Sequence, residues 1–254
     1  MKTFVALLQR DVTVLIRDLP EFVMRIAMQP FLFVFVFGYV LPSIGQVKSS
    51  YANLLLPGIL AASMMMAGVQ GTAIPLSQDF GAIKEIEDRL MAPIRISMVV
   101  LEKIVMGTLQ AWIAGGLVFP LAWAIMRSNL SLHVTSFGYL FLYLFLVGLA
   151  SAATGITLGT IISPFKIPLM FATIIIPMIF LGATYYPWHA LSNVVWLQTI
   201  ILINPMVYAA EGFRSVLTPG IPHIRMLFTI LGLFAAVIIL SGIGLRGFIK
   251  RAYS

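Results

Sequence analysis

The sequence contains no cysteine, so it offers neither a disulfide framework nor a thiolate metal site. It also has no Gly-Lys dipeptide, and therefore no phosphate-binding loop of the GxxxxGK[ST] type. Charge is scarce as well, because Asp, Glu, Lys and Arg make up only 10% of the chain. Soluble proteins carry about a quarter of such residues. If ATP drives this protein, another polypeptide must hydrolyse it.

Apolar sequence is what the chain has in abundance, with 60% hydrophobic residues among 254 and a mean hydropathy of +1.02. Several apolar runs exceed about 18 residues, the length that crosses about 30 Å of hydrocarbon. We therefore expect an all-α integral membrane protein with a single transmembrane domain over residues 1–254. The predicted spans lie at about 22–42, 52–76, 97–125, 136–162, 167–183 and 226–248.

The first residues do not have the pattern of a cleaved signal peptide. Residues 2–21 carry six charged side chains, and the long apolar run comes only after them. Within 3–18 the apolar residues form one helical stripe, made of Phe4, Leu8, Val12, Leu15 and Ile16. We expect an interfacial helix there, lying along the membrane surface.

The distribution of basic residues predicts the orientation. Six spans place both termini on one side, and with the N-terminus inside, twelve of the sixteen Lys and Arg residues are cytoplasmic. This bias favours cytoplasmic termini. The excess of sixteen basic over nine acidic residues then reflects loop charge, and no nucleic-acid partner is expected.

One polar segment, residues 78–95, carries seven charges between two apolar runs. Its middle, about 82–92, has the apolar spacing of a short amphipathic helix, and Pro93 ends it. Two interpretations stay open: an ordinary solvated loop, or a cytoplasmic helix on which a soluble partner docks. The candidate docking residues are Lys84, Glu85, Glu87, Asp88, Arg89 and Leu90.

The segment 184–225 is partly apolar but is interrupted by proline and asparagine, so its runs are too short to span. We expect short re-entrant helices at the outer face over 187–215. Asn204-Pro205 breaks one helix and can cap the next. Tyr208, Glu211 and Arg214 then follow at i, i+3 spacing on one face. They form either an ion pair that stabilises the turn or a contact for exported substrate.

Other motifs point to packing rather than chemistry. Ser151, Gly155 and Gly159 recur at i, i+4 and i+8, a small-residue stripe for close helix contact. The three histidines are isolated, so no metal site is expected, and the GxGxxG match at 242–247 follows no strand. No catalytic constellation is present, and we expect no enzymatic activity from this chain by itself.

The order of these features resembles the type 2 (ABC-2) permease subunits of ATP-binding-cassette exporters. The resemblance covers nearly the whole chain, although each motif is short. Leu181 stands where the family often has serine. The matching pieces are the N-terminal interfacial helix, Leu56-Pro57-Gly58, the run from Glu85 to Pro93, Gly182-Ala-Thr-Tyr185-Tyr186-Pro187, and Asn204-Pro205 through Tyr208 to Arg214.

The resemblance implies a homodimer of permeases in a bacterial plasma (inner) membrane, with two separate ATPase subunits that bind the ATP and Mg. This chain would hold no cofactor. Its 82–92 helix would be the coupling helix. The implied outer gate consists of Tyr185, Tyr186, Asn204, Pro205, Tyr208, Glu211 and Arg214.

Family members export drugs, lipids or lipid-linked glycans, and glycan exporters tend to have aromatic-lined channels. Aromatic residues cluster in the first and fourth spans at period two, which spreads them over more than one helix face. We expect no clean stacking stripe, and therefore favour a hydrophobic or amphipathic substrate over a glycan. Two further classes of protein stay open. One is a stand-alone channel or secondary carrier, with Arg25 as its intramembrane charge, and the second is a membrane-embedded enzyme.

Overall fold

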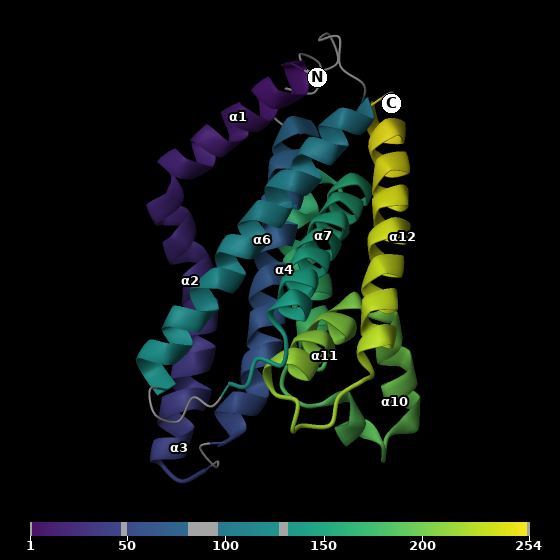
Figure 1. Ribbon diagram of the computed structural model, residues 1–254. Coiled ribbons are helices and arrows are strands. Elements are labelled where there is room, and N and C mark those ends of the chain that lie inside the picture. Colours follow the sequence, from purple (N-terminus) through teal and green to yellow (C-terminus); the bar gives the residue numbers. More distant parts are fainter. Residues whose placement is uncertain (1, 47–49, 81–95, 127–131, 253–254) are drawn as a thin grey trace.

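The computed structural model describes residues 2–46, 50–80, 96–126 and 132–252, and all regular structure in them is helical (Figure 1). Within these residues, five helical segments are long and apolar enough to cross a membrane: Leu19–Ser43, Asn53–Phe80, Ile96–Met126, Phe137–Ile161 and Met226–Ala252. A bent pair, Val195–Ile203 and Pro205–Leu217, makes six if it counts as one span. The predicted all-α integral membrane fold is confirmed.

The first helix starts at one end of the bundle and meets the second at an angle along its side (Figure 1). In α1 (Lys2–Arg17), Leu15 packs on a small apolar cluster that includes Phe22 and Ala114. The next helix, α2 (Leu19–Phe35), has a proline in its first turn, where a missing N–H donor costs nothing. It continues through a π-helical turn, Val36–Val40, into α3, Leu41–Ser43.

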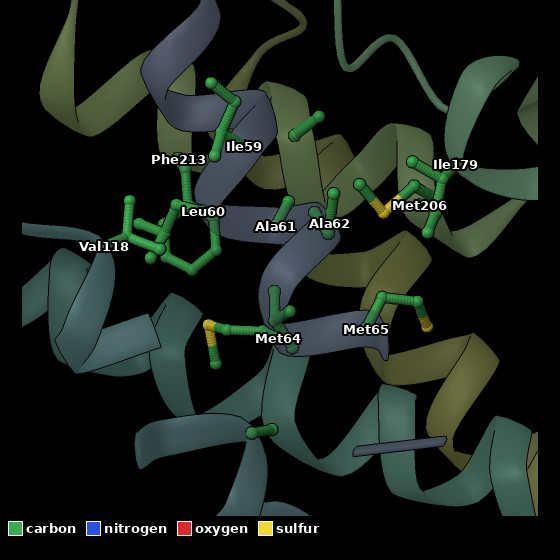
Figure 2. Packing of buried hydrophobic residues seen from close by; sticks show 14 of the residues in the cluster. Ile59, Leu60, Ala61, Ala62, Met64, Met65, Val118, Ile179, Met206 and Phe213 are labelled. Carbon is green, nitrogen blue, oxygen red and sulfur yellow. The ribbon is translucent and has the colours of Figure 1, made fainter. Parts of the chain in front are cut away.

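The centre of the bundle is α4 (Ser50–Phe80), which packs against α6 (Ile96–Met126) and α7 (Phe137–Ile161). A helix that is apolar on all sides belongs in the interior. Accordingly, Leu60, Met64 and Met65 are fully buried. Figure 2 shows the side chains of α4 between Val118 of α6 and, on another side, Met206. The methionines therefore serve as core.

The small-residue stripe of α7 faces α4. A Cβ added at Gly155 would lie 1.8 Å from Thr72 Oγ1 and 2.9 Å from Val69 Cα, so only glycine fits there. At Gly159 the added atom would lie 3.1 Å from Ala73 Cα. The stripe thus lets two backbones of the same chain approach closely.

The helix at the predicted fifth span, 167–183, is short and irregular. It is assembled from a 3-10 turn Pro164–Lys166, α8 (Ile167–Met170), a π-helical turn Phe171–Ile175 and α9 (Ile176–Phe180). At about 1.5 Å per residue these residues, Pro164–Phe180, extend about 25 Å, a little less than the hydrocarbon thickness. The turn that follows contains Ala183, with a φ of 55°.

Short helices occupy the region where re-entrant helices were predicted. They are the 3-10 turn Trp188–Leu191, α10 (Val195–Ile200), the 3-10 turn Ile201–Ile203 and α11 (Pro205–Leu217). The chain bends by 100° between Val195–Ile203 and α11. The last helix, α12 (Met226–Ala252), returns along the bundle and ends at the same end of it as the start of α1 and the start of α6 (Figure 1). The first and last helices therefore have their terminal ends on the same side.

Candidate functional site

Buried polar side chains form two clusters, one around α11 and one where α1 contacts α4 and α6. α11 and the start of α6 lie toward opposite ends of the bundle (Figure 1). The α11 cluster begins with Asn204, whose extended backbone stops the preceding 3-10 turn. Its side-chain oxygen accepts a hydrogen bond from Met206 N at 3.0 Å, and its amide nitrogen donates to Met178 O at 2.7 Å. With Pro205 at the first helical position, this is a capped helix start.

Glu211 and Arg214 form a buried ion pair on one face of α11. Both side chains are completely shielded from solvent, and Arg214 Nη1 donates a hydrogen bond to Glu211 Oε1. The i, i+3 spacing of a helix brings them together. The sequence left open an ion pair or a substrate contact, and the structure contains the ion pair. Whether it gates a transport pathway remains a prediction.

The pair also connects α11 to three other segments. Glu211 Oε1 accepts a hydrogen bond from Trp188 N at 2.9 Å, and Oε2 accepts one from Ile224 N at 2.8 Å. Arg214 Nη2 donates to Ala183 O at 2.9 Å. The positive φ of Ala183 is unfavourable for a residue with a Cβ. A backbone held in that state indicates a turn fixed by its surroundings.

Tyr208 lies apart from this ion pair. Its hydroxyl donates to Leu202 O at 2.6 Å, and its ring packs on Gly232 of α12, where an added Cβ would lie 2.6 Å from the ring. Tyr185 and Tyr186 contact other helices. The ring of Tyr185 lies 5.1 Å from that of Phe180, and burial raises the pKa of its hydroxyl to about 12.

The aromatic residues of α2 overturn one expectation. Phe31 and Phe35 stack with ring centroids 5.7 Å apart, and Phe35 and Tyr39 stack at 5.8 Å. All three rings are exposed. The prediction that no clean stacking stripe forms is therefore wrong. A period-two run contains an i, i+4 subset, and residues four apart are neighbours on a helix surface.

The second cluster was not anticipated from the sequence. Lys103 Nζ of α6 lies 3.4 Å from Asp11 Oδ2 of α1, 3.5 Å from Asp79 Oδ2 of α4 and 3.9 Å from Glu102 Oε2. Lys103 and Glu102 are buried. In the sequence, Asp11 lies in the predicted interfacial helix, and Asp79 and Lys103 lie near the ends of two predicted spans, all on the side predicted to be cytoplasmic. That shared position was the signal from which the cluster could have been predicted.

The carboxyl group of Asp11 responds to this environment. Burial raises its pKa, but a hydrogen bond with Glu102 and the charges of Lys103 and Arg10 outweigh burial. The net result is a pKa below the usual value for aspartate, so Asp11 is ionised at neutral pH. A cavity of about 520 Å³ lies beside the cluster, between α1, α2, α4 and α6. Its lining contains charges of both signs, including Arg25, which was singled out from the sequence.

The predicted docking helix 82–92, with Lys84, Glu85, Glu87, Asp88, Arg89 and Leu90, lies outside the described residues. Its neighbours along the chain do lie within them, since α4 ends at Phe80 and α6 begins at Ile96. Within the described ranges, no three His, Asp or Glu side chains gather as a metal ion would require.

A family model described as ABC-2 type transporter matches residues 2–218, which run from α1 through α11 and include both polar clusters. No curated protein matches the chain.

Proposed function

Because the chain belongs to the ABC-2 type transporter family, we propose that it is the membrane subunit of an exporter powered by a separate ATPase. Membership makes it an ABC-type permease component with an ABC ATPase component as its partner. The finer proposal is export of a hydrophobic or amphipathic molecule out of the cytoplasm or the inner leaflet. Two copies of the chain and two ATPase subunits would assemble in a bacterial inner membrane, with both termini cytoplasmic.

The observation that carries the proposal is the charge cluster around Lys103. It joins α1 to α4 and α6, the two helices that flank residues 81–95. An ATPase docked on 82–92 would push on the ends of both helices. Separating a buried charge from its partners costs several kcal/mol. The three helices would therefore move together, and the motion of the ATPase would reach the interfacial helix.

The surface of α2 supports a largely apolar substrate. A cavity of about 540 Å³ lies along this helix, and Leu32, Phe33 and Val36 are among its lining residues. Only 22% of the most apolar 18-residue stretch within Leu19–Ser43 is buried inside the chain. A hydrocarbon chain or a planar drug would gain contact with these apolar side chains, while Arg25 and Gln29 give the lining a polar part.

Export of a lipid-linked glycan is the second candidate, and the exposed stack of Phe31, Phe35 and Tyr39 favours it. Flat aromatic faces in a row offer a sliding surface to sugar rings. Changing Phe35 to Ala interrupts the stack at its middle. If a glycan is the substrate, this variant should export much less of it. A hydrophobic dye or lipid should depend instead on the apolar cavity of α2.

Co-purification tests the partner directly. The tagged chain, extracted from membranes in mild detergent, should bring down an ABC ATPase. Changing Glu85, Glu87 and Asp88 together to Lys should uncouple ATP hydrolysis from transport and leave the amount of inserted protein unchanged. Glu21→Lys, an exposed charge reversal in α2, is the matched control. Unchanged ATPase binding and transport in the triple variant would remove the docking role of 82–92.

A further inference from the structure

A cavity of about 620 Å³ lies near α11, between the Trp188–Leu191 turn, the Ile201–Ile203 turn and the start of α12. The segments that line it lie at the end of the bundle away from the start of α6 (Figure 1). Its lining divides into two parts. One part is polar and consists of His189, His223 and Arg225. The other part is apolar and includes Leu202, Phe228 and Leu231.

The polar part carries positive charge. None of the lining residues, all within the described part of the chain, is acidic. Arg225 is exposed, and among the described residues its guanidinium makes no ion pair. It directly precedes α12, whose first turns line the cavity, and the N-terminal end of a helix carries partial positive charge. Glu211, whose carboxylate accepts hydrogen bonds from two lining residues, Trp188 and Ile224, is paired with Arg214. The cavity therefore favours an anionic group.

The remaining polar atoms of the walls are already satisfied within the protein. Tyr208 donates its hydroxyl proton to Leu202 O, and Trp188 Nε1 donates to Gln198 O at 3.0 Å. These aromatic residues thus present rings rather than hydrogen-bonding groups. A ligand would meet one cationic edge and otherwise apolar surface.

The apolar part runs into the outward face of α12. Phe228 and Leu231 are 57% and 54% exposed, and the exposed series continues through Phe234 and Ile238. Only 11% of the most apolar 18-residue stretch of α12 is buried, so the rest of the chain leaves this face uncovered. The cavity is therefore a cationic site at one end of an exposed apolar strip on α12.

We propose that this cavity binds a phospholipid with an anionic headgroup, taken from the leaflet at this end of the bundle. The phosphate lies against Arg225 and His223, where charge-assisted hydrogen bonds form. One acyl chain follows Phe228 and Leu231 along α12. A free phosphate ion shares the headgroup chemistry, but it would leave the apolar part of the cavity unused, which is why a lipid fits better.

The buried ion pair sets the shape of this site. The two hydrogen bonds of Glu211 reach Trp188 N and Ile224 N, and both of these residues line the cavity. One carboxylate therefore holds two walls at a fixed separation. By linkage, a lipid that bridges these walls stabilises the same arrangement that Glu211 stabilises.

The experiment uses the purified, delipidated chain in detergent. Phosphatidylglycerol, phosphatidylcholine and inorganic phosphate are titrated separately, while the thermal unfolding midpoint and native mass spectra report binding. Phosphatidylglycerol should raise the midpoint and stay bound in the gas phase, and the other two should do so weakly. Arg225→Gln should weaken phosphatidylglycerol binding by about tenfold or more, since a hydrogen bond to a charged group contributes about 1.5–3 kcal/mol. Arg225→Lys should keep most of it.

A second pair of variants tests the apolar part. Leu231→Trp fills the cavity and should abolish retention of phosphatidylglycerol, whereas Phe234→Trp, exposed on the same helix but outside the lining, should not. Both positions face outward, so folding is expected to survive either change. An equal response to inorganic phosphate would overturn the lipid in favour of a soluble anion. Phosphatidylglycerol binding that is absent, or unaltered in both Arg225→Gln and Leu231→Trp, would overturn the site.

Discussion

The ion pair of α11 supports a double-mutant cycle with a sharp expected outcome. Arg214→Met removes the counter-ion and leaves a carboxylate that still accepts hydrogen bonds from Trp188 N and Ile224 N. Glu211→Gln leaves an uncompensated guanidinium at a position with 0% exposure. Breaking one half of a buried pair costs about 3–5 kcal/mol, so each single variant should lose about that much free energy of unfolding.

The double variant, Glu211→Gln with Arg214→Met, removes both charges. If the effects were additive, the loss would be about 6–10 kcal/mol. Because neutral side chains of similar volume leave no buried charge, the double variant should instead be more stable than either single one. The amide oxygen of Gln can still accept one of the two backbone hydrogen bonds, and the orphaned N–H costs about 1–3 kcal/mol.

A charge swap at the same positions distinguishes the contribution of the ion pair from that of its backbone hydrogen-bond partners. The i, i+3 spacing alone predicts that Glu211→Arg with Arg214→Glu recovers part of the loss. The structure predicts no recovery, because the new guanidinium would face two N–H donors and the new carboxylate would face Ala183 O. Equilibrium unfolding in bicelles measures all four variants. Additive losses, or a swap with wild-type stability, would refute the reasoning.

The other predictions concern packing, orientation and acid stability. Gly155→Ala should destabilise the α4–α7 contact strongly, since its Cβ would lie 1.8 Å from a neighbouring oxygen, whereas Gly242→Ala, with nothing within 4 Å, should not; thermal unfolding compares them. A cysteine at Ser192 should react with an impermeant thiol reagent in intact cells and one at Ser254 should not, and reversed labelling refutes the orientation. Because the pKa of Asp11 is lower in the folded protein, its carboxylate stabilises the fold at pH values above the unfolded pKa of about 3.9. This contribution is lost as the pH falls through the folded pKa. Asp11→Asn should therefore be less stable than wild type at neutral pH and equal to it in acid below the folded pKa of Asp11; a difference that persists in acid contradicts this cause.

Much of the fold follows from periodicity and run length. Apolar runs locate the long helices because membrane crossing demands a minimum length. Asn204-Pro205 marks a helix start because the capping hydrogen bond joins residues two apart. The pairing of Glu211 with Arg214 is equally local, since these residues are three apart. These features depend on residues within one or two turns of each other, which a sequence displays directly.

The partners that sequence reasoning did not find are distant ones. Glu211 accepts hydrogen bonds from backbone groups 23 and 13 residues away, in other segments of the chain. Asp11, Asp79 and Lys103 come from three helices, and periodicity describes one helix at a time. The aromatic stack of α2 escaped prediction for a different reason. The period-two run as a whole covers several helix faces, but Phe31, Phe35 and Tyr39, four residues apart, share one face.

ATP-driven transport by the reconstituted complex tests the central claim most directly. The chain and its co-purified ATPase are placed in liposomes, and a fluorescent lipid analogue or labelled glycan is followed with and without ATP and Mg. Substrate should move only when the ATPase and ATP are both present, and collapse of ion gradients should leave transport intact. Transport by the chain alone, or driven by a proton gradient without ATP, would contradict the account and make this protein a channel or secondary carrier.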